Sequence, residues 1–374
     1  MNITLISKRR LVTLIIFTFL VCISTGRLFS QPAYYVVKGK VVDKSSKAPL
    51  AGASVFAQNT TFGVASDADG NFTIKLPNGG YSLIVTYTGY ETETVRISNT
   101  SLQIDNLNFE LDPKEKSLEE VSVAISSEVK DGWQKYGEFF TQNFIGQTTF
   151  AKQCVIKNPE VLHFYFSKKK NRLKVLAKEP LTVENFALGY ILKFAIDSFT
   201  YEYNTNTSLF IGYPLFEQMQ GTADQADVWT KNRAIAYSGS MLHFVRSLYN
   251  RSLEKEGFEL QFIVKNNEAE IPIPLQNLYR AMNYLKDDST GTVEFRPNQN
   301  EVAVIYKNAM PEQAYLDTDP TIKKDFQLST LLFAPGESVI IEQNGYYYDQ
   351  ADITTNGYLG FKKIGDMLPY DYEP

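Results

Sequence analysis

The sequence predicts an N-terminal all-β antiparallel sandwich followed by a larger α+β domain. Hydrophobic residues alternate between turns from Val36 to Leu111, whereas helical spacing first appears near residues 129–145. At 374 residues, with 44% hydrophobic and 21% charged residues, the chain is long enough for two domains that each bury a core. We divide it into a leader (1–30), the sandwich (31–112), a linker (113–127) and the α+β domain (128–374).

The sandwich is predicted from period-two runs that end at strong turns. Phe72, Ile74 and Leu76 would share one face of a strand, and the turn Pro77–Gly80 follows at once. No helical stretch interrupts the pattern. The expected strands are 37–42, 53–58, 71–76, 81–88, 95–97 and 107–111.

Four segments of this region resemble the carboxypeptidase-regulatory-like domain: Val36–Asp43, Pro49–Val55, Ser66–Phe72 and Tyr87–Tyr90. The resemblance covers about a fifth of the chain and implies a transthyretin-like sandwich of Greek-key type. It implies no peptidase activity, because in that family the activity belongs to a separate zinc domain. Related modules occur in secreted proteins of Gram-negative bacteria.

Similar modules also precede the plug of TonB-dependent outer-membrane transporters, where a motif like Leu118–Val123 leads into the plug. The residues that remain here are too few for a plug and a large barrel, so the sequence argues against a transporter. We expect Leu118–Val123 to form a strand that carries the chain into the second domain.

The run Asp67-Ala68-Asp69-Gly70-Asn71 allows two interpretations. Asp67, Asp69 and Asn71 resemble the opening of a calcium loop, but such a loop needs Gly at its sixth position and Glu at its twelfth. Gly70 falls at the fourth position, so we favour a hairpin turn in which aspartates bond their own backbone. Calcium remains the alternative.

The first 30 residues have the form of an export signal. Lys8-Arg9-Arg10 precedes an apolar run, Leu11–Ile23, that is too short for an ordinary membrane span. A cleavage site is expected between Ser30 and Gln31. Lipidation at Cys22 and an uncleaved anchor are the alternatives, and they offer the expected routes to membrane association.

The net charge limits the expected partners, and the cysteine content limits the expected chemistry. The formal charge of −5 becomes −9 once the four basic residues of the leader are removed, which disfavours nucleic acid. Cys154 is then the only cysteine, so no internal disulfide can form. We expect it to act as a small buried hydrophobic residue and not as a nucleophile.

The second domain mixes helices and strands. A hairpin with the solvated tip Lys168–Lys170 is expected, and a long strand within Asn185–Tyr203 should pair with Leu209–Met219. Gly257 is expected to end the helix that begins at Ser240. The remaining predicted helices are 129–145, 226–236 and 275–285, and further strands are predicted at 258–264, 291–296, 301–306 and 338–343.

Familiar catalytic motifs do not occur in the sequence. His163 and His243 are the only histidines, and no zinc-protease motif or Gly-x-Ser-x-Gly sequence is present. Ser240 and His243 lie three residues apart on one predicted helix, which is poor geometry for a nucleophile and its base. No cofactor is indicated.

Basic residues cluster on the two predicted helices between 226 and 256. Some of them could converge on a carboxylate or another anion, and Arg233, His243 and Arg246 are the binding candidates. The alternative is a solvated basic face paired with Glu254 and Glu256. The whole cluster comprises Lys231, Arg233, His243, Arg246 and Arg251. The segments Trp229–Arg233, Ala236–Ser240 and His243–Leu248 are similar to a tract found after the same module in exported bacterial proteins of unassigned role.

These observations predict an exported, non-enzymatic envelope protein that binds or scaffolds at the cell surface or outer membrane of a Gram-negative bacterium. Its expected partners are envelope proteins or glycans. The rival hypothesis is an envelope hydrolase acting on peptides or glycans, with its site in the second domain. A facing pair of carboxylates, or a histidine with an acid in a deep cleft, would favour the rival.

Overall fold

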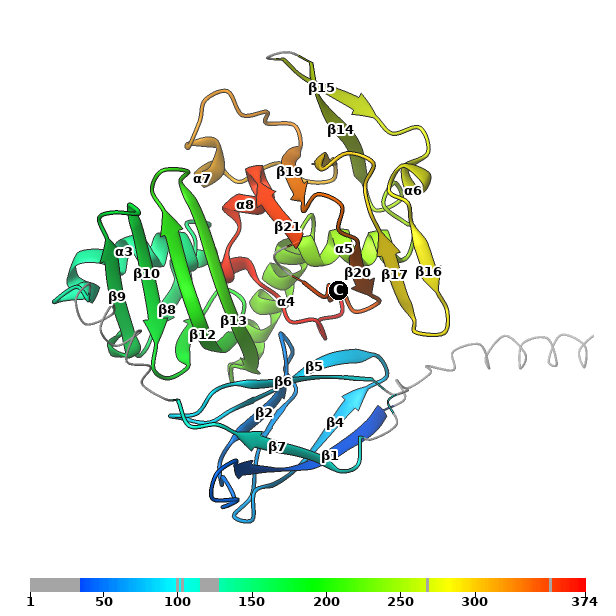
Figure 1. Cartoon of the computed structure of the whole chain (residues 1–374). Helices are drawn as coiled ribbons and strands as arrows, with labels where there is room; N and C mark the ends of the chain where they lie inside the picture. Colours follow the sequence, from blue (N-terminus) through cyan, green and yellow to red (C-terminus); the bar gives the residue numbers. More distant parts are fainter. Residues whose placement is uncertain (1–33, 99–100, 102–103, 115–127, 267–268, 350–351) are drawn as a thin grey trace, which may run out of the picture.

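A computed structural model of the chain describes residues 34–98, 101, 104–114, 128–266, 269–349 and 352–374. The leader, its expected cleavage site, Cys22 and the expected strand Leu118–Val123 lie outside these residues. Among the described residues, no helix has both the length and the apolar composition needed to cross a membrane. The chain folds around three hydrophobic cores, one in the sandwich and two in the part that follows (Figure 1).

The N-terminal residues form the predicted sandwich (Figure 1, blue to cyan). Phe72, Ile74 and Leu76 point into its core, as the alternation predicted. Gly39 is required where β1 meets β7, since a Cβ there would lie 2.4 Å from the carbonyl oxygen of Leu107. One sheet has the order β4–β1–β7 and the other β3–β2–β5–β6, and the β1–β7 pairing is parallel. The strands are β1 (Tyr34–Asp43), β2 (Ser54–Ala57), β3 (Gly63–Ala65), β4 (Asn71–Pro77), β5 (Gly80–Thr86), β6 (Glu93–Ser98) and β7 (Leu107–Leu111).

The second core lies between a sheet and helix α3 (Gly132–Phe144), whose Phe140 and Phe144 are fully buried. Alternation in β12 places Leu192, Phe194 and Ile196 on the face that α3 covers. The predicted hairpin with the lysine tip is present as β9 and β10. The sheet has the order β8–β11–β12–β10–β9, and β13 pairs with the long β12. Its strands are β8 (Cys154–Ile156), β9 (Leu162–Ser167), β10 (Arg172–Ala177), β11 (Leu181–Asn185), β12 (Tyr190–Glu202) and β13 (Thr207–Gln218).

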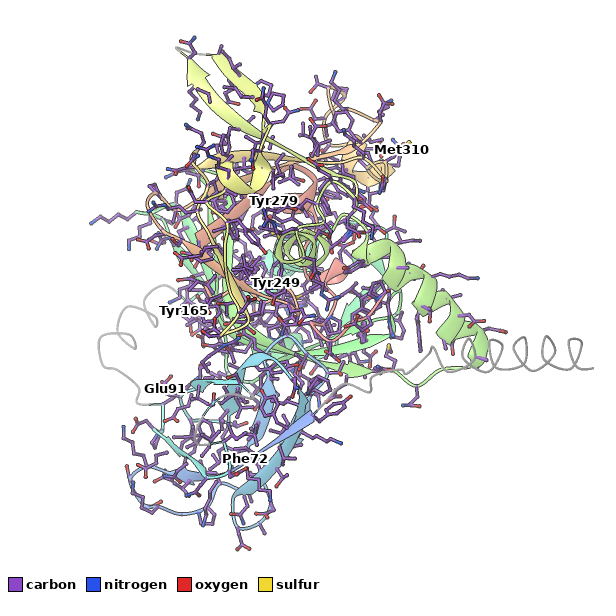
Figure 2. The ribbon with its side chains drawn as sticks, turned by 90° about the vertical axis from the view of Figure 1, so that its right-hand side faces the viewer. Phe72, Glu91, Tyr165, Tyr249, Tyr279 and Met310 are labelled. Atoms are coloured by element: carbon purple, nitrogen blue, oxygen red, sulfur yellow. The ribbon has the colours of Figure 1, made fainter. Side chains whose placement is uncertain are left out.

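The third core lies under helix α5 (Met241–Tyr249), which presents Phe244, Val245 and Leu248 to two further sheets. Figure 2 shows Tyr249 and Tyr279 in this part of the molecule, and Phe72 in the sandwich at the opposite end. The sheets have the orders β15–β14–β18–β19–β21 and β16–β17–β20. Their strands are β14 (Phe258–Asn266), β15 (Ala269–Pro274), β16 (Leu285–Asp287), β17 (Thr292–Phe295), β18 (Glu301–Tyr306), β19 (Gln327–Phe333), β20 (Val339–Glu342) and β21 (Ile353–Asn356).

The C-terminal segment returns to the centre of the molecule. Ile364, Leu368 and Tyr370 join the core of the β12 sheet, far from their neighbours in sequence. In Figure 1 the C-terminus lies between α4 and α5 and the sandwich. The remaining helices are α4 (Ala223–Tyr237), α6 (Leu278–Ala281), α7 (Gln313–Leu316) and α8 (Gly357–Phe361), with short 3₁₀ turns at Ala151–Gln153, Pro159–Val161 and Ile364–Asp366.

Two predicted helices differ from the structure. The helix expected to run from Ser240 to Glu256 ends at Tyr249, because Arg251 adopts a left-handed backbone with φ of 54°. Leu253 still points into the core, so its apparent helical spacing reflects burial in a turn and not continued helix. The helix expected over 275–285 is reduced to α6, because β15 precedes it and the short strand β16 begins at Leu285.

Candidate functional site

Arg233 on α4 binds the chain's own backbone. Its guanidinium donates hydrogen bonds to the carbonyl oxygens of Leu188 (2.7 Å) and Gly189 (3.1 Å). The same group lies over the ring of Tyr190, 3.9 Å from the ring centre. These contacts of Arg233 hold α4 against the turn that leads into β12.

Arg246 on α5 has a similar role at the C-terminus. Its guanidinium donates to the carbonyl oxygens of Asn344 (3.0 Å), Tyr370 (2.9 Å) and Tyr372 (2.8 Å). The residue is only 8% exposed, and the planar fork of arginine suits several acceptors at once. The C-terminal segment is therefore held against α5.

His243 lies beside Arg246 and is also buried. Its Nδ1 accepts the backbone N–H of Gly239 at 3.2 Å, and its Nε2 lies 3.5 Å from a carboxylate oxygen of Glu256. Burial lowers the pKa of His243, although Glu256 acts in the opposite direction. Ser240, weighed above as a nucleophile, instead caps α5 by accepting the backbone N–H of His243.

The predicted basic cluster is therefore only partly assembled. Burial raises the pKa of Tyr372, and the nearby cations Arg233 and Arg246 partly oppose that rise. Of the other three members, His243 is buried beside Arg246, whereas Lys231 is exposed and Arg251 lies over the rings of Tyr279 and Tyr284. The atoms that Arg233 and Arg246 bind are carbonyl oxygens of this chain.

The C-terminal segment also binds the sandwich. The backbone N–H of Tyr370 donates to the carbonyl oxygen of Asn59 at 2.7 Å. Asp371 accepts the backbone N–H of Thr61 at 2.8 Å and a second hydrogen bond from its hydroxyl group. One short segment thus joins α5 to the turn between β2 and β3.

A second set of contacts joins β5 and β6 to β20. Arg96 of β6 forms an ion pair with Glu342, which also accepts the backbone N–H of Gly80 at 3.1 Å. The Arg96 guanidinium lies over Tyr346, 4.3 Å from the ring centre. The hydroxyl groups of Ser82 and Tyr346 are 2.9 Å apart.

Apolar contacts complete this interface. Phe56 and Ile84 lie on the sandwich faces that point away from its own core, and they pack against Leu215 of β13. Backbone hydrogen bonds run in both directions here, from Asn59 to Pro214 at 2.7 Å and from Phe216 to Thr60 at 2.9 Å. The sandwich therefore contacts the rest of the chain through apolar, polar and backbone interactions.

A cavity of about 210 Å³ lies where these contacts meet. It is lined by residues from the sandwich turn, β13, α5, α8 and the C-terminal segment, among them Asn59, Phe210, Leu242, Lys362, Lys363 and Asp366. Burial raises the pKa of Asp366 to about 6, and its carboxylate accepts a hydrogen bond of 2.8 Å from Thr148. These residues could not be predicted from the sequence, because no motif marks side chains that a fold brings together from distant segments.

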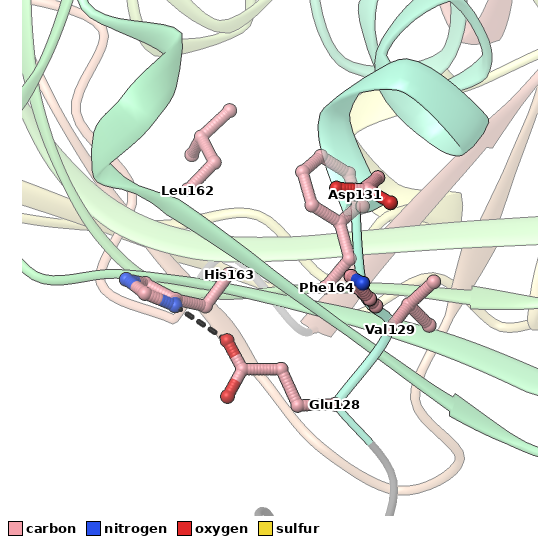
Figure 3. A pocket seen from close by; sticks show the side chains of 8 residues that line it. Glu128, Val129, Asp131, Leu162, His163 and Phe164 are labelled. Carbon is pink, nitrogen blue, oxygen red and sulfur yellow. Dashed lines mark hydrogen bonds and ion pairs between the residues drawn. The ribbon is translucent and has the colours of Figure 1, made fainter.

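A larger pocket, of about 440 Å³, opens at the start of α3 (Figure 3). His163 of β9 points toward Glu128, and its Nδ1 lies 2.7 Å from the carboxylate. None of the eight described residues that line this pocket is Ser, Thr or Cys. Among the described lining residues, the histidine and the carboxylate are therefore not accompanied by a hydroxyl or thiol nucleophile.

The weak calcium candidate is a turn in the structure. Asp67 accepts the backbone N–H groups of Asp69 (2.9 Å) and Asn71 (2.8 Å), which is how an aspartate closes a tight turn. These bonds hold the pKa of Asp67 below its usual value. Within the described ranges, no group of three or more His, Cys, Asp or Glu residues is placed to hold a metal ion. Cys154 is half-buried, and burial raises its pKa to about 12.

Comparison with known proteins agrees with the fold of the first domain. Residues 37–123 match the family described as the CarboxypepD_reg-like domain. The chain therefore carries a carboxypeptidase-regulatory-like domain at its N-terminus, a module that is regulatory-like and not itself catalytic. No curated protein matches the chain.

Three solved structures illustrate the similarities. A cohesin–X-dockerin complex from Acetivibrio cellulolyticus is 30% identical over 20% of this chain and 51% of its own, with a TM-score of 0.16. A DUF3823 family protein from Parabacteroides merdae is 10% identical over 53% and 85%, with a TM-score of 0.19. A putative membrane-associated protein of unknown function from Bacteroides fragilis is 11% identical over 87% and 95%, with a TM-score of 0.18. This chain spans about half the length of the first.

Proposed function

We propose that the protein is exported and acts as a binding or scaffolding protein at the surface or outer membrane of a Gram-negative bacterium. The observation that carries the proposal is the attachment of the sandwich, through Glu342 and Asp371, to the rest of the chain. We infer that a module held by these contacts presents the same face to a partner. The class of its N-terminal domain, which is regulatory-like, supports binding over catalysis.

Among the described residues, exposed side chains mark the outer side of the sheet β4–β1–β7 as a face available to a partner. Tyr34 and Val36 are 46% and 38% exposed there, and the ammonium of Lys75 lies 4.6 Å from the centre of the Tyr34 ring. Lys38 and Lys40 continue the same row of exposed side chains along β1. An aromatic ring beside several cations suits an acidic glycan or an acidic protein surface. We assign partner binding to this face.

The proposal is tested by recovery of partners from envelope extracts. The tagged protein is compared with a variant in which Lys38, Lys40 and Lys75 are changed to Ser. The matched control changes three exposed lysines elsewhere, at the hairpin tip 168–170. Partner recovery should fall in the first variant and persist in the second. Equal recovery from both would remove the β1 face from the proposal, and cell fractionation that leaves the protein in the cytoplasm would overturn its location.

Hydrolysis is the second candidate, and the pair of His163 with Glu128 favours it (Figure 3). A histidine held by a carboxylate can act as a general base toward water. The pocket supplies no nucleophile among its described lining residues, so the reaction would need direct attack by water. Release of products from cell-wall glycan or peptide by the wild type, and not by His163→Gln, would favour this candidate.

A further inference from the structure

The cavity at the junction of the sandwich, β13, α5 and the C-terminal segment has the features of a small-molecule site. Its wall is largely apolar, with Phe210, Leu242 and Leu359 contributed by three different elements. Its volume of about 210 Å³ lies below the roughly 300–1,000 Å³ of pockets for drug-sized ligands. A molecule about the size of one aromatic ring with short substituents would fit.

The lining of the cavity includes two lysines. Lys362 and Lys363 follow α8 and line the cavity together. Among the described residues, neither ammonium has a carboxylate within 4.0 Å, although Lys362 lies over the ring of Tyr358 at 5.1 Å. Burial lowers the pKa of both lysines, as expected for ammonium groups removed from water without a close counter-ion.

Asp366 does not neutralise these cations fully. Its carboxylate accepts a hydrogen bond from Thr148 and, among the described residues, lies more than 4.0 Å from both lysine ammonium groups. The attraction of Asp366 and Glu312 for Lys362 acts against burial but is smaller. The lining holds two lysines and one aspartate, so its net charge is positive when all three are ionised, and a bound anion would favour that state.

Asn59 supplies an unused hydrogen-bond acceptor. It is 2% exposed and lines the cavity, and its side-chain oxygen Oδ1 has no hydrogen-bond partner among the described residues. Its backbone is in the left-handed region, with φ of 58°, and is held from both sides by Pro214 and Tyr370. A buried acceptor without a donor is costly, and a small turn of this side chain toward the cavity would let a ligand supply the missing donor.

We propose that this cavity binds a small organic carboxylate with an apolar body and a hydrogen-bond donor. Lys362 and Lys363 receive the carboxylate, the apolar wall covers the body, and Asn59 Oδ1 accepts the hydrogen bond from the donor. The binding requires the sandwich and the C-terminal segment to be in place, because Asn59 comes from the former and Lys363 from the approach to the latter. This inference is independent of the partner face on β1.

The test uses three probes that differ in one group each. 4-Hydroxybenzoate has the carboxylate and the donor, benzoate lacks the donor, and 4-hydroxybenzamide lacks the charge. Calorimetry with the purified protein should show one site for 4-hydroxybenzoate, several-fold weaker binding of benzoate and about tenfold or weaker binding of the amide. Inorganic phosphate, which has no apolar body, should not compete.

Substitutions test whether the probes bind in the cavity or elsewhere on the protein surface. Lys363→Met should weaken the binding of 4-hydroxybenzoate at least about tenfold. Asn59→Gly keeps the left-handed backbone and should abolish the preference for 4-hydroxybenzoate over benzoate. Lys168→Met, at the exposed hairpin tip, is the matched control and should change nothing. Thermal unfolding confirms that each variant is folded. No saturable binding of either carboxylate to the folded wild type, or equal binding to Lys363→Met, would overturn the proposal.

Discussion

Arg246 donates a hydrogen bond of 2.9 Å to the carbonyl oxygen of Tyr370, across 124 residues of chain. Tyr370 in turn donates its backbone N–H to Asn59 of the sandwich. One buried guanidinium therefore lies at the start of a path of contacts from the central helix to the N-terminal domain. Substitutions that remove these contacts, or others between the sandwich and the rest of the chain, should therefore lower the stability of the protein.

Replacing Arg246 by Lys should destabilise the protein by roughly 2–4 kcal/mol. An ammonium on a narrower stem cannot reach three carbonyl oxygens, and hydrogen bonds from charged donors are worth about 1.5–3 kcal/mol each. Denaturant unfolding measures the loss, and hydrogen exchange should show faster opening at Tyr370 and Tyr372. Arg251→Lys is the matched control, because Arg251 lies over Tyr279 and Tyr284 at the surface of α6. Similar losses in both variants would contradict the role assigned to Arg246.

Replacing Glu342 by Ala should lower the free energy of unfolding by about 3 kcal/mol and should weaken the attachment of the sandwich to the rest of the chain. The change leaves the half-buried Arg96 without its partner and the backbone N–H of Gly80 without an acceptor. We expect calorimetry to show the sandwich melting before the remainder of the chain. Glu270→Ala, which removes an exposed ion pair with Lys265, should change stability by less than about 1 kcal/mol. A single unaltered transition in Glu342→Ala would show that the interface is not held by this pair.

Replacing Asp366 by Asn should change how stability depends on pH. Burial raises the pKa of Asp366 from 3.8 to about 6, so the folded state favours the protonated form. The stabilising contribution is complete below pH 3.8 and is lost as pH rises through 6. Relative to wild type, Asp366→Asn should therefore gain stability between pH 4 and 7, by up to about 3 kcal/mol. Unfolding of both proteins at several pH values measures the difference, and a gap independent of pH would contradict the shift.

Calcium should leave the melting temperature unchanged. The Asp67 carboxylate is already engaged by two backbone N–H groups, so the loop behaves as a turn. Asp67→Ala should lower the melting temperature with or without calcium, and Asp69→Ala should have little effect, because no side-chain bond of Asp69 holds the turn. A rise in melting temperature on adding calcium, lost on chelation, would restore the metal interpretation.

The strands of the sandwich could be predicted from the sequence, whereas the contacts of the basic residues could not. Phe72, Ile74 and Leu76 could be assigned to a core because alternation is a local property of a strand. The partners of Arg233 and Arg246 could not be predicted, because they are backbone carbonyl oxygens. Every residue carries such an oxygen, so the sequence does not show which ones accept these hydrogen bonds. The helix predicted to continue to Glu256 was wrong because Leu253 is equally buried in a turn.

The sequence alone determined that residues 36–111 form a sandwich and that helices and strands alternate after it, since periodicity and turn residues act over a few positions. Only the tertiary structure decided that Ile84 and Phe56, on the outer faces of that sandwich, would be covered by Leu215. It also decided that Asn59, Lys363 and Asp366 would meet around one cavity. Contacts between segments hundreds of residues apart depend on how three cores pack together, and no local pattern records that packing.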